Sequence, residues 1–473
     1  MTPTNFTNLP NELIREIILE ALPESFESLA LSCKAVYQLC TPFIEGHNRL
    51  RRRFRSFTYW DDPPDSSPLA IRTAFEVIKC LAIEPITAPY IEHVELDYDS
   101  FHWSLRGKPP QILPDFHHGG PIVELFANSS HLKEAGLDWK EFYTLIGEDL
   151  GRPGLHRYSQ RAAAFLLTLL PNLKTLARRS NCSWGKPSLA AVTRFSAYSD
   201  YRYKEELYRH ALPFLALPHV REFNAISSED AADSFITLAY QDSYSGYRET
   251  LKTVSFTNFL FHHLAVETFL RHVPRPMKLT YSHSPKINDS EEWNMSEFVT
   301  AIEREVGNHL EEFSISITDV QGSVAPGKVS MRGFKRLKKL EFPLEIAMCN
   351  IADAESRLGI PPNSLISQEQ HWGEHGLSVG DIVPATVCHL SIILSTIILS
   401  SGMDAKILKV LFSNFAAMKD SHLPALKEIR LRLRSDSYEE ECANLVVEME
   451  RVGVVLMTTR VESLEPAHTF SES

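Results

Sequence analysis

Apolar side chains recur at helical spacing within the first forty or so residues of the chain. A proline, Pro10, stands where a helix can begin without its N–H, and charged residues lie opposite the apolar stripe. The stripe runs through Leu13, Ile14, Ile17, Ile18 and Leu22. Pro23 is expected to end this helix, and two further short helices should follow, the last ending near Pro42. Because three short helices bury little apolar area alone, part of this surface needs a partner, in this chain or in another protein.

From Leu69 onwards, helix-like stretches alternate with short segments that carry apolar residues at their first, fourth and sixth positions. Most segments follow a predicted helix, and they begin at Ile91, Leu132, Leu173, Val220, Leu251, Met277, Leu310, Leu337, Val387, Leu426 and Val454. This alternation predicts an α/β fold with parallel strands side by side and helices outside. A non-repetitive α/β or α+β domain is the alternative.

In such a sheet, the side chains between the apolar positions face the side that the helices leave uncovered. The first strand would show His93, Glu95 and Asp97 there. The segment at Leu132 would add Glu134 and Asp138. The strand at the basic end would show Arg430, Arg432 and Arg434. Alternating arginines can converge on a carboxylate-rich or phosphorylated segment, so the first and last sets are predicted to bind a target. The alternative is a solvated terminal strand that its charges protect from aggregation.

Composition narrows the class of protein. With 473 residues, of which 44% are apolar, the chain is long enough for two or more structural units. The net charge of −12 argues against nucleic-acid binding, which needs a basic surface. Seven scattered cysteines without a C-x-x-C pair suit reduced thiols, and the longest apolar run is too short to span a bilayer. The N-terminus carries no secretory signal pattern. We therefore expect a cytoplasmic or nuclear location, or both, with no membrane and no nucleic-acid partner.

Few patterns suggest catalysis. Residues His371 to His375 read H-x-x-E-H, which matches a zinc-peptidase pattern literally. That chemistry needs both histidines on one helical face, whereas Gly373 and Gly376 weaken a helix. The run His117-His118-Gly119-Gly120 is similar to an esterase loop, but no G-x-S-x-G accompanies it, and phosphate-binding glycine loops are missing. We therefore expect no catalytic residue, no metal site and no cofactor.

A basic block follows the helical segment, at Arg49, Arg51, Arg52, Arg53 and Arg55. A polar, proline-rich stretch comes next, from Asp61 to Pro68. The expected division is a helical module over residues 1–46, a linker over 47–68, a long domain over 69–460 and a tail over 461–473. We interpret the basic block as a solvated linker helix, with a nuclear-import signal or a nucleic-acid contact as alternatives.

The N-terminal residues resemble the F-box. The resemblance rests on Leu9-Pro10-x-Glu12-Leu13-x-x-x-Ile17, on Leu22-Pro23, and on Ser28-Leu29-Ala30-Leu31-Ser32-Cys33-Lys34-Ala35-Val36-Tyr37. The chain departs from the family by having Val36-Tyr37 where a tryptophan is frequent. The motif covers less than a tenth of the chain.

The resemblance implies that this module docks on the Skp-type adaptor of SCF (Skp–cullin–F-box) ubiquitin ligases. The chain would then be a non-catalytic, substrate-recognition subunit in the ubiquitin-conjugation pathway, joined to cullin through the adaptor and bound to an unidentified protein target. The alternative is an F-box protein that works outside a complete ligase, as an adaptor-bound scaffold or regulator. Some of the implied adaptor-binding residues must pack inside the module: Leu9, Pro10, Leu13, Ile14, Ile17, Leu22, Leu29, Leu31, Val36 and Tyr37.

The long remainder resembles a degenerate leucine-rich-repeat solenoid, a form common in fungal-type F-box proteins. Apolar residues at positions one, four and six are the strand signature of these repeats. The spacing between segments is irregular, and the asparagine that usually follows the strand is mostly missing. Five of the six Leu-Lys dipeptides nevertheless begin a predicted segment, at Leu132, Leu173, Leu251, Leu337 and Leu426. The implied fold is α/β, with a short α-helical F-box followed by an irregular solenoid of parallel strands and outer helices.

Overall fold

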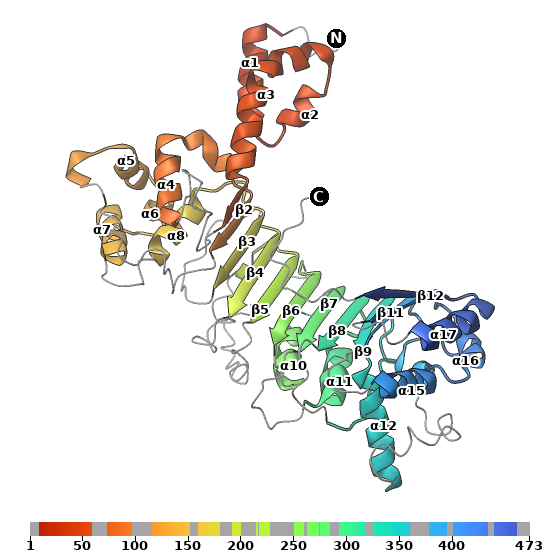
Figure 1. The fold of residues 1–473 in the computed structure, drawn as a ribbon. Coiled ribbons are helices and arrows are strands. Elements are labelled where there is room, and N and C mark those ends of the chain that lie inside the picture. Colours follow the sequence, from red (N-terminus) through yellow and green to blue (C-terminus); the bar gives the residue numbers. More distant parts are fainter. Residues whose placement is uncertain are drawn as a thin grey trace. The chain divides into compact units, whose positions relative to one another are not determined.

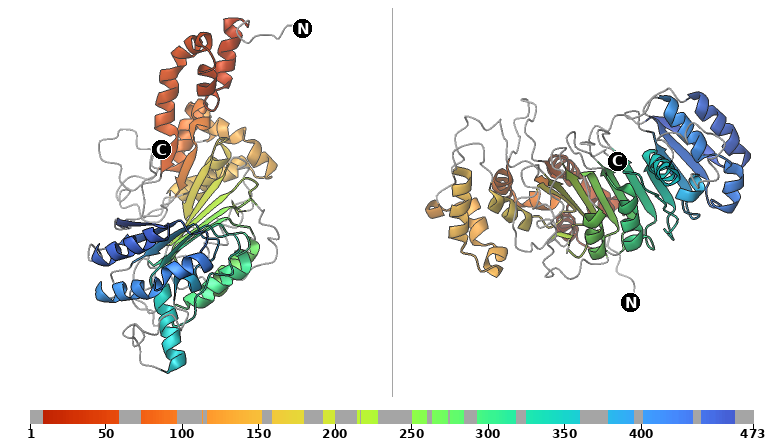
Figure 2. Two further views of the ribbon diagram at one scale, coloured as in Figure 1. Left: turned by 90° about the vertical axis from the view of Figure 1, so that its right-hand side faces the viewer. Right: turned by 90° about the horizontal axis from the view of Figure 1, so that it is seen from below.

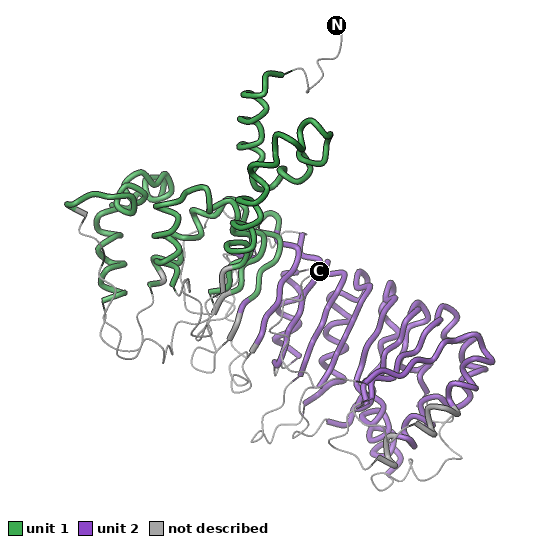
Figure 3. The backbone as a smooth tube through the Cα atoms, turned by 45° about the horizontal axis from the view of Figure 1, so that its top comes forward, with its two compact units in different colours: residues 1–196, 217–219 green, residues 197–216, 220–473 purple. Residues whose placement is uncertain are grey.

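The computed structural model (Figure 1) describes residues 9–58, 73–96, 113, 116–151, 159–179, 192–199, 214–215, 217–227, 250–259, 263–273, 275–283, 293–317, 325–359, 378–394, 401–433 and 439–460. The chain divides into two compact units (Figure 3). The first unit contains residues 1–196 and 217–219, and the second contains residues 197–216 and 220–473.

Three helices open the first unit: α1 (Asn11–Glu20), α2 (Phe26–Ala30) and α3 (Lys34–Phe54). The predicted first helix is confirmed, because α1 begins directly after Pro10 and ends before Pro23. The three helices enclose a core of their own, formed by Ile14, Ile18, Phe26, Ala30, Val36 and Cys40. This helical module, residues 9–54, therefore has an inside and an outside, which the apolar stripe alone did not define.

The expected end of the third helix near Pro42 is wrong, because α3 continues to Phe54. Pro42 removes one backbone hydrogen bond, but it lies on the exposed side of the helix. Buried positions continue beyond it at His47 and Phe54, so packing maintains the helix across the proline. The range 47–68, expected to be a linker, thus begins inside α3, and its residues Ser56–Thr58 form strand β1.

The rest of the first unit combines short parallel strands with helices. Strand β1 pairs with β2 (His93–Leu96), and β2 pairs with β3 (Thr175–Arg179), both in parallel. The first and third predicted segments, at Ile91 and Leu173, are therefore strands. The helices are α4 (Ala74–Ile83), η2 (Pro85–Tyr90), η4 (Phe116–His118), α5 (Pro121–Ala127), α6 (Ser130–Glu134), α7 (Trp139–Gly151) and α8 (Gln160–Thr168).

The prediction of a strand at Leu132 is wrong, because this residue lies in α6. The hydroxyl of Ser129 accepts a hydrogen bond from the Leu132 N–H and so caps the helix. Gly136, with φ of 67°, ends it in the left-handed conformation. Glu134 consequently lies in a helix, and Asp138 lies just before α7, where its carboxylate accepts a backbone N–H. Neither residue belongs to a strand of the sheet.

The strands follow the order of the chain from β1 to β12. Neighbouring strands pair in parallel from β1 to β3 and from β5 to β12. The predicted α/β class with parallel strands is therefore confirmed. The remaining strands are β4 (Arg194–Ser199), β5 (Glu222–Ser227), β6 (Thr253–Phe259), β7 (Lys278–His283), β8 (Glu312–Ile317), β9 (Lys339–Pro343), β10 (His389–Ile393), β11 (Glu428–Leu433) and β12 (Val455–Arg460).

The apolar spacing predicts strands correctly because the residues at its first, fourth and sixth positions are buried. Leu251, Val254 and Phe256 are 3%, 0% and 0% exposed, respectively. The same three positions are buried in the segments that begin at Leu310, Leu337, Val387 and Leu426. Parallel neighbours in register stack these side chains into one continuous core, which explains how irregularly spaced segments form a regular sheet.

In the described part of the second unit, helices follow strands β6, β7, β9, β10 and β11 (Figure 2). They are α10 (His263–His272), α11 (Met295–Val306), α12 (Glu345–Leu358), α14 (Val379–Ile382), α15 (Ser401–Leu411), α16 (Phe415–Ser421) and α17 (Glu439–Arg451). Helices α10, α11, α12 and α15 contact one another in that order. No helix in the described part of the chain has both the length and the apolar character that a membrane crossing needs.

A buried polar cluster lies at the end of β7. The Tyr281 hydroxyl donates to the carbonyl of Phe259 at 2.8 Å and lies 3.1 Å from Nδ1 of His283. The His283 ring stacks on Trp293, with ring centres 3.7 Å apart. His283 is 2% exposed, and this burial lowers its pKa to about 3. The imidazole is therefore neutral at physiological pH.

Candidate functional site

The helical module exposes several of the apolar residues that the sequence assigned to adaptor binding. Leu13, Ile17, Leu31 and Tyr37 are 46%, 36%, 80% and 48% exposed, and Pro10 is exposed as well. Leu13 and Ile17 lie one helical turn apart on the same side of α1. Side chains of this size are costly to leave in water, so their exposure marks a surface suited to a protein partner.

The other five predicted residues face inward. Ile14 and Val36 are buried in the module core. Leu9, Leu22 and Leu29 are partly buried and pack against that core. The structure thus separates residues that shape the module from residues available to a partner. Leu19, which is 50% exposed on another side of α1, was not among the predicted residues.

One residue that sequence reasoning missed, His47, connects the module to the rest of the first unit. Its ring lies against Phe26 of α2 and Tyr90 of η2, with ring centres 4.7 Å and 5.4 Å away. Its Nδ1 lies 3.1 Å from the Tyr90 hydroxyl. Burial lowers the pKa of His47, against the opposing effect of the Glu27 carboxylate. His47 follows Val36 and Cys40 at buried helical positions, which was the available signal in the sequence.

Part of the basic block is neutralised by ion pairs within the first unit. Arg51 pairs with Glu27 of α2, and Arg55 pairs with Glu92 beside β2 at 3.2 Å. The Arg51 pair therefore joins two helices within the module, whereas the Arg55 pair helps to hold the module against β2. The block's remaining members are exposed on α3, namely Arg49, Arg52 and Arg53.

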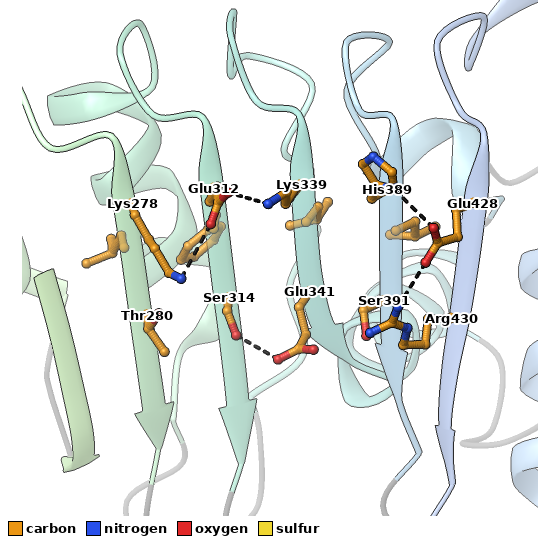
Figure 4. A pocket seen from close by; sticks show the side chains of 14 residues that line it. Lys278, Thr280, Glu312, Ser314, Lys339, Glu341, His389, Ser391, Glu428 and Arg430 are labelled. Carbon is orange, nitrogen blue, oxygen red and sulfur yellow. Dashed lines mark hydrogen bonds and ion pairs between the residues drawn. The ribbon is translucent and has the colours of Figure 1, made fainter. Parts of the chain in front are cut away.

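A groove lies on the face of the second unit's sheet that looks toward the viewer in Figure 4, with helices behind the strands. Its volume is about 540 Å³, and five successive strands, β7 to β11, line it. The first residues of these strands form one row, consisting of Lys278, Glu312, Lys339, His389 and Glu428. A second row, two residues further along each strand, consists of Thr280, Ser314, Glu341, Ser391 and Arg430.

Charges in the groove are connected across strands (Figure 4). The Glu312 carboxylate contacts both Lys278 and Lys339, at 3.4 Å and 2.6 Å. The hydrogen bond from Lys339 lowers the pKa of Glu312, so this carboxylate is ionised at neutral pH. In a second group, Glu428 lies 3.3 Å from the His389 ring and 3.1 Å from Arg430.

The predicted arginine set is only partly described. Arg430 and Arg432 alternate on one side of β11, as expected. Each is already paired, however: Arg430 with Glu428 and Arg432 with Glu341, at 3.0 Å for the second pair. Arg434 lies outside the described residues. The arginines that the structure describes therefore offer less unbalanced positive charge than the sequence suggested.

At the acidic end of the prediction, His93 and Glu95 lie half-buried on β2, while Asp97 lies outside the described residues. Burial lowers the pKa of His93, although the neighbouring Glu92 acts in the opposite direction. Glu92 lies 3.7 Å from the His93 ring and 3.1 Å from the Lys174 ammonium. Glu92 and His93 thus belong to a local charge cluster at the start of β2.

The two sequence patterns considered for catalysis have different outcomes. Residues 371–375, which carry H-x-x-E-H, lie outside the described residues. His117 and His118 end the short helix η4, and Gly119 and Gly120 then take φ of 68° and 112° before α5 begins. These glycines therefore form the turn that leads into α5. Glycine adopts such positive φ angles without strain.

Comparison with protein families gives no match to any family model, and no curated protein matches the chain.

Proposed function

We propose that this chain is a substrate-recognition subunit of an SCF-type ubiquitin ligase, which binds a Skp-type adaptor through the helical module. The observation that carries the proposal is the exposure of Leu13, Ile17, Leu31 and Tyr37 on a module that already has a filled core. These residues occupy motif positions of the F-box resemblance. Because they are not needed inside the module, they are available for an adaptor surface.

The anchoring of the module supports this proposal physically. His47, Arg51 and Arg55 connect α3 to α2, η2 and the start of β2. The backbone carbonyl of Arg55 also accepts hydrogen bonds from the N–H groups of Glu92 and His93. These contacts would hold the module in a fixed position relative to the strands that follow it within the first unit. A ligase subunit needs such a connection to hold a target near the transferred ubiquitin.

The proposed division of labour requires no catalysis by this chain. The adaptor and cullin would bring the ubiquitin-transfer machinery, and the uncovered sheet face of the second unit would hold a protein target. Proximity then supplies the effective concentration for transfer. The polar groove across β7 to β11 is the surface that we assign to the target.

Reconstitution with adaptor and cullin tests the proposal. We expect the full chain, a Skp-type adaptor and a cullin to form a 1:1:1 complex whose molar mass can be measured by light scattering after gel filtration. A chain that binds adaptor but stays apart from cullin is instead a scaffold outside the ligase. A folded chain that binds neither protein contradicts the proposal.

A further inference from the structure

The groove on the second unit's sheet has an uneven balance of charge. Lys278 and Lys339 share the single carboxylate of Glu312, each contacting one of its oxygens. The arginines each have a carboxylate of their own: Arg430 pairs with Glu428, and Arg432 pairs with Glu341. We call the triad of Lys278, Glu312 and Lys339 the lysine pair site. Its two ammonium groups face one carboxylate, so the site has one positive charge in excess.

The surroundings of the lysine pair site fit a polar segment of protein. Lys278 and Lys339 are 51% and 59% exposed, so their ammonium groups are accessible. Ser391, in the second row of the groove, has a buried hydroxyl oxygen without a hydrogen-bond partner. Thr280 adds a further hydroxyl in the same row, whereas the Ser314 hydroxyl already donates to Glu341 at 2.8 Å. A peptide backbone can use such groups, while carboxylates meet the lysines.

The same charges argue against a nucleic acid as the occupant. Three carboxylates, those of Glu312, Glu341 and Glu428, line the groove beside the cations. A continuous phosphate backbone would meet these carboxylates at close range and be repelled. A peptide can place an acidic side chain at the lysine pair site and neutral residues elsewhere.

We propose that the groove binds an extended, polar segment of the protein target, with one or two Asp or Glu carboxylates at Lys278 and Lys339 and neutral residues elsewhere. Only the assignment of this segment to a ligase target rests on the function proposed above. It moves the predicted acidic-partner site from the arginines of β11 to the lysines of β7 and β9. In this arrangement Glu312 competes with the incoming carboxylate for both ammonium groups.

Neighbouring residues provide matched controls. Lys338 and Glu311 precede Lys339 and Glu312 directly in the chain and form a comparable ion pair at 2.7 Å. They do not line the groove. A change at Lys338 or Glu311 therefore removes the same kind of ion pair, directly before the same two strands, without altering the lysine pair site. A purely structural role for these charges predicts equal effects at both positions.

The test measures the fluorescence anisotropy of a fluorescein-labelled 12-residue peptide on addition of the full chain. The peptide has two glutamates, two positions apart at its centre, and serine at the other positions. We expect Lys339→Glu to weaken binding roughly tenfold, because it reverses a contacting charge. We expect Glu312→Gln to tighten binding about threefold, because it removes the competing carboxylate. Lys338→Glu and Glu311→Gln should each change binding by less than about twofold, since their charges lie outside the groove.

Three results would overturn the inference. One is an equal affinity for the same peptide with glutamine in place of glutamate. Another is an equal effect of the control and groove variants. The third is a 12-nucleotide single strand that binds more tightly than the peptide and responds to the same variants. Adaptor binding measured on the same preparations separates the two proposals. An unchanged chain that binds the adaptor but not the peptide contradicts the groove proposal, and an unchanged chain that binds the peptide but not the adaptor contradicts the ligase function.

Discussion

Replacing Leu13 and Ile17 together by alanine is expected to weaken binding of the Skp-type adaptor by about a thousandfold. We expect both residues to be hot spots, which cost about 2 kcal/mol or more each when truncated, and two of them together correspond to roughly three orders of magnitude in Kd. Both side chains lie on the outside of α1, 46% and 36% exposed. The module should stay folded, because its core retains Ile14 and Ile18.

Leu19→Ala is the matched control for this variant. Leu19 is on the same helix and 50% exposed, but it lies on another side of α1. It should bind adaptor as the unchanged chain does. Titration calorimetry gives the affinities, and far-ultraviolet circular dichroism confirms that the helices persist. Unchanged adaptor binding by a folded Leu13→Ala, Ile17→Ala chain would show that this side of α1 is not the interface.

Acidification is expected to destabilise the second unit through His283. In the folded state burial lowers its pKa to about 3, whereas an unfolded histidine titrates near 6.5. Between these values the unfolded chain binds a proton that the folded chain excludes, so stability falls as pH falls. The contribution is complete above about pH 6.5 and decreases by about 1.4 kcal/mol for each pH unit below it.

The arrangement around the ring explains why it resists protonation. The single hydroxyl proton of Tyr281 is directed to the carbonyl of Phe259, so the hydroxyl oxygen is left to accept from Nδ1–H of His283. Trp293 covers one ring face. A second proton would place a positive charge in a site where burial opposes it.

Urea unfolding at pH 7, 6 and 5, followed by tryptophan fluorescence, measures the effect. His283→Gln removes the titrating group and should flatten the dependence of the unfolding midpoint on pH, even though the variant is less stable at pH 7. His309→Gln changes an exposed histidine of the same unit and should keep the original slope. If His283→Gln also keeps that slope, the buried imidazole does not cause the acid sensitivity.

Much of the sheet could be predicted from the sequence because burial follows a short, local pattern. The spacing at Leu251, Val254 and Phe256 identifies a strand whose apolar residues all enter the core. The same spacing failed at Leu132, because a serine cap and a following glycine turn it into a short helix. Strand β4 escaped prediction, although Val192, Phe195 and Ala197 are buried at the same spacing. An alanine at the sixth position makes the pattern weak.

The docking surfaces were less predictable because they depend on contacts between distant residues. The helical stripe of α1 contains both Ile14 and Leu13, and only packing against α2 and α3 decides which one is buried. In the sheet, Arg432 was predicted to face a partner, but it pairs with Glu341, a residue 91 positions away. Nor does the sequence show that Glu312 serves two lysines from different strands. Only the register of the strands brings these charges together.

Co-expression of this chain with a Skp-type adaptor shows whether the helical module docks on the adaptor. The complex would be isolated by gel filtration and its molar mass measured by light scattering. We expect a 1:1 complex for the unchanged chain. A chain that is folded by circular dichroism yet elutes alone, at 53.7 kDa, would show that the module does not dock on the adaptor.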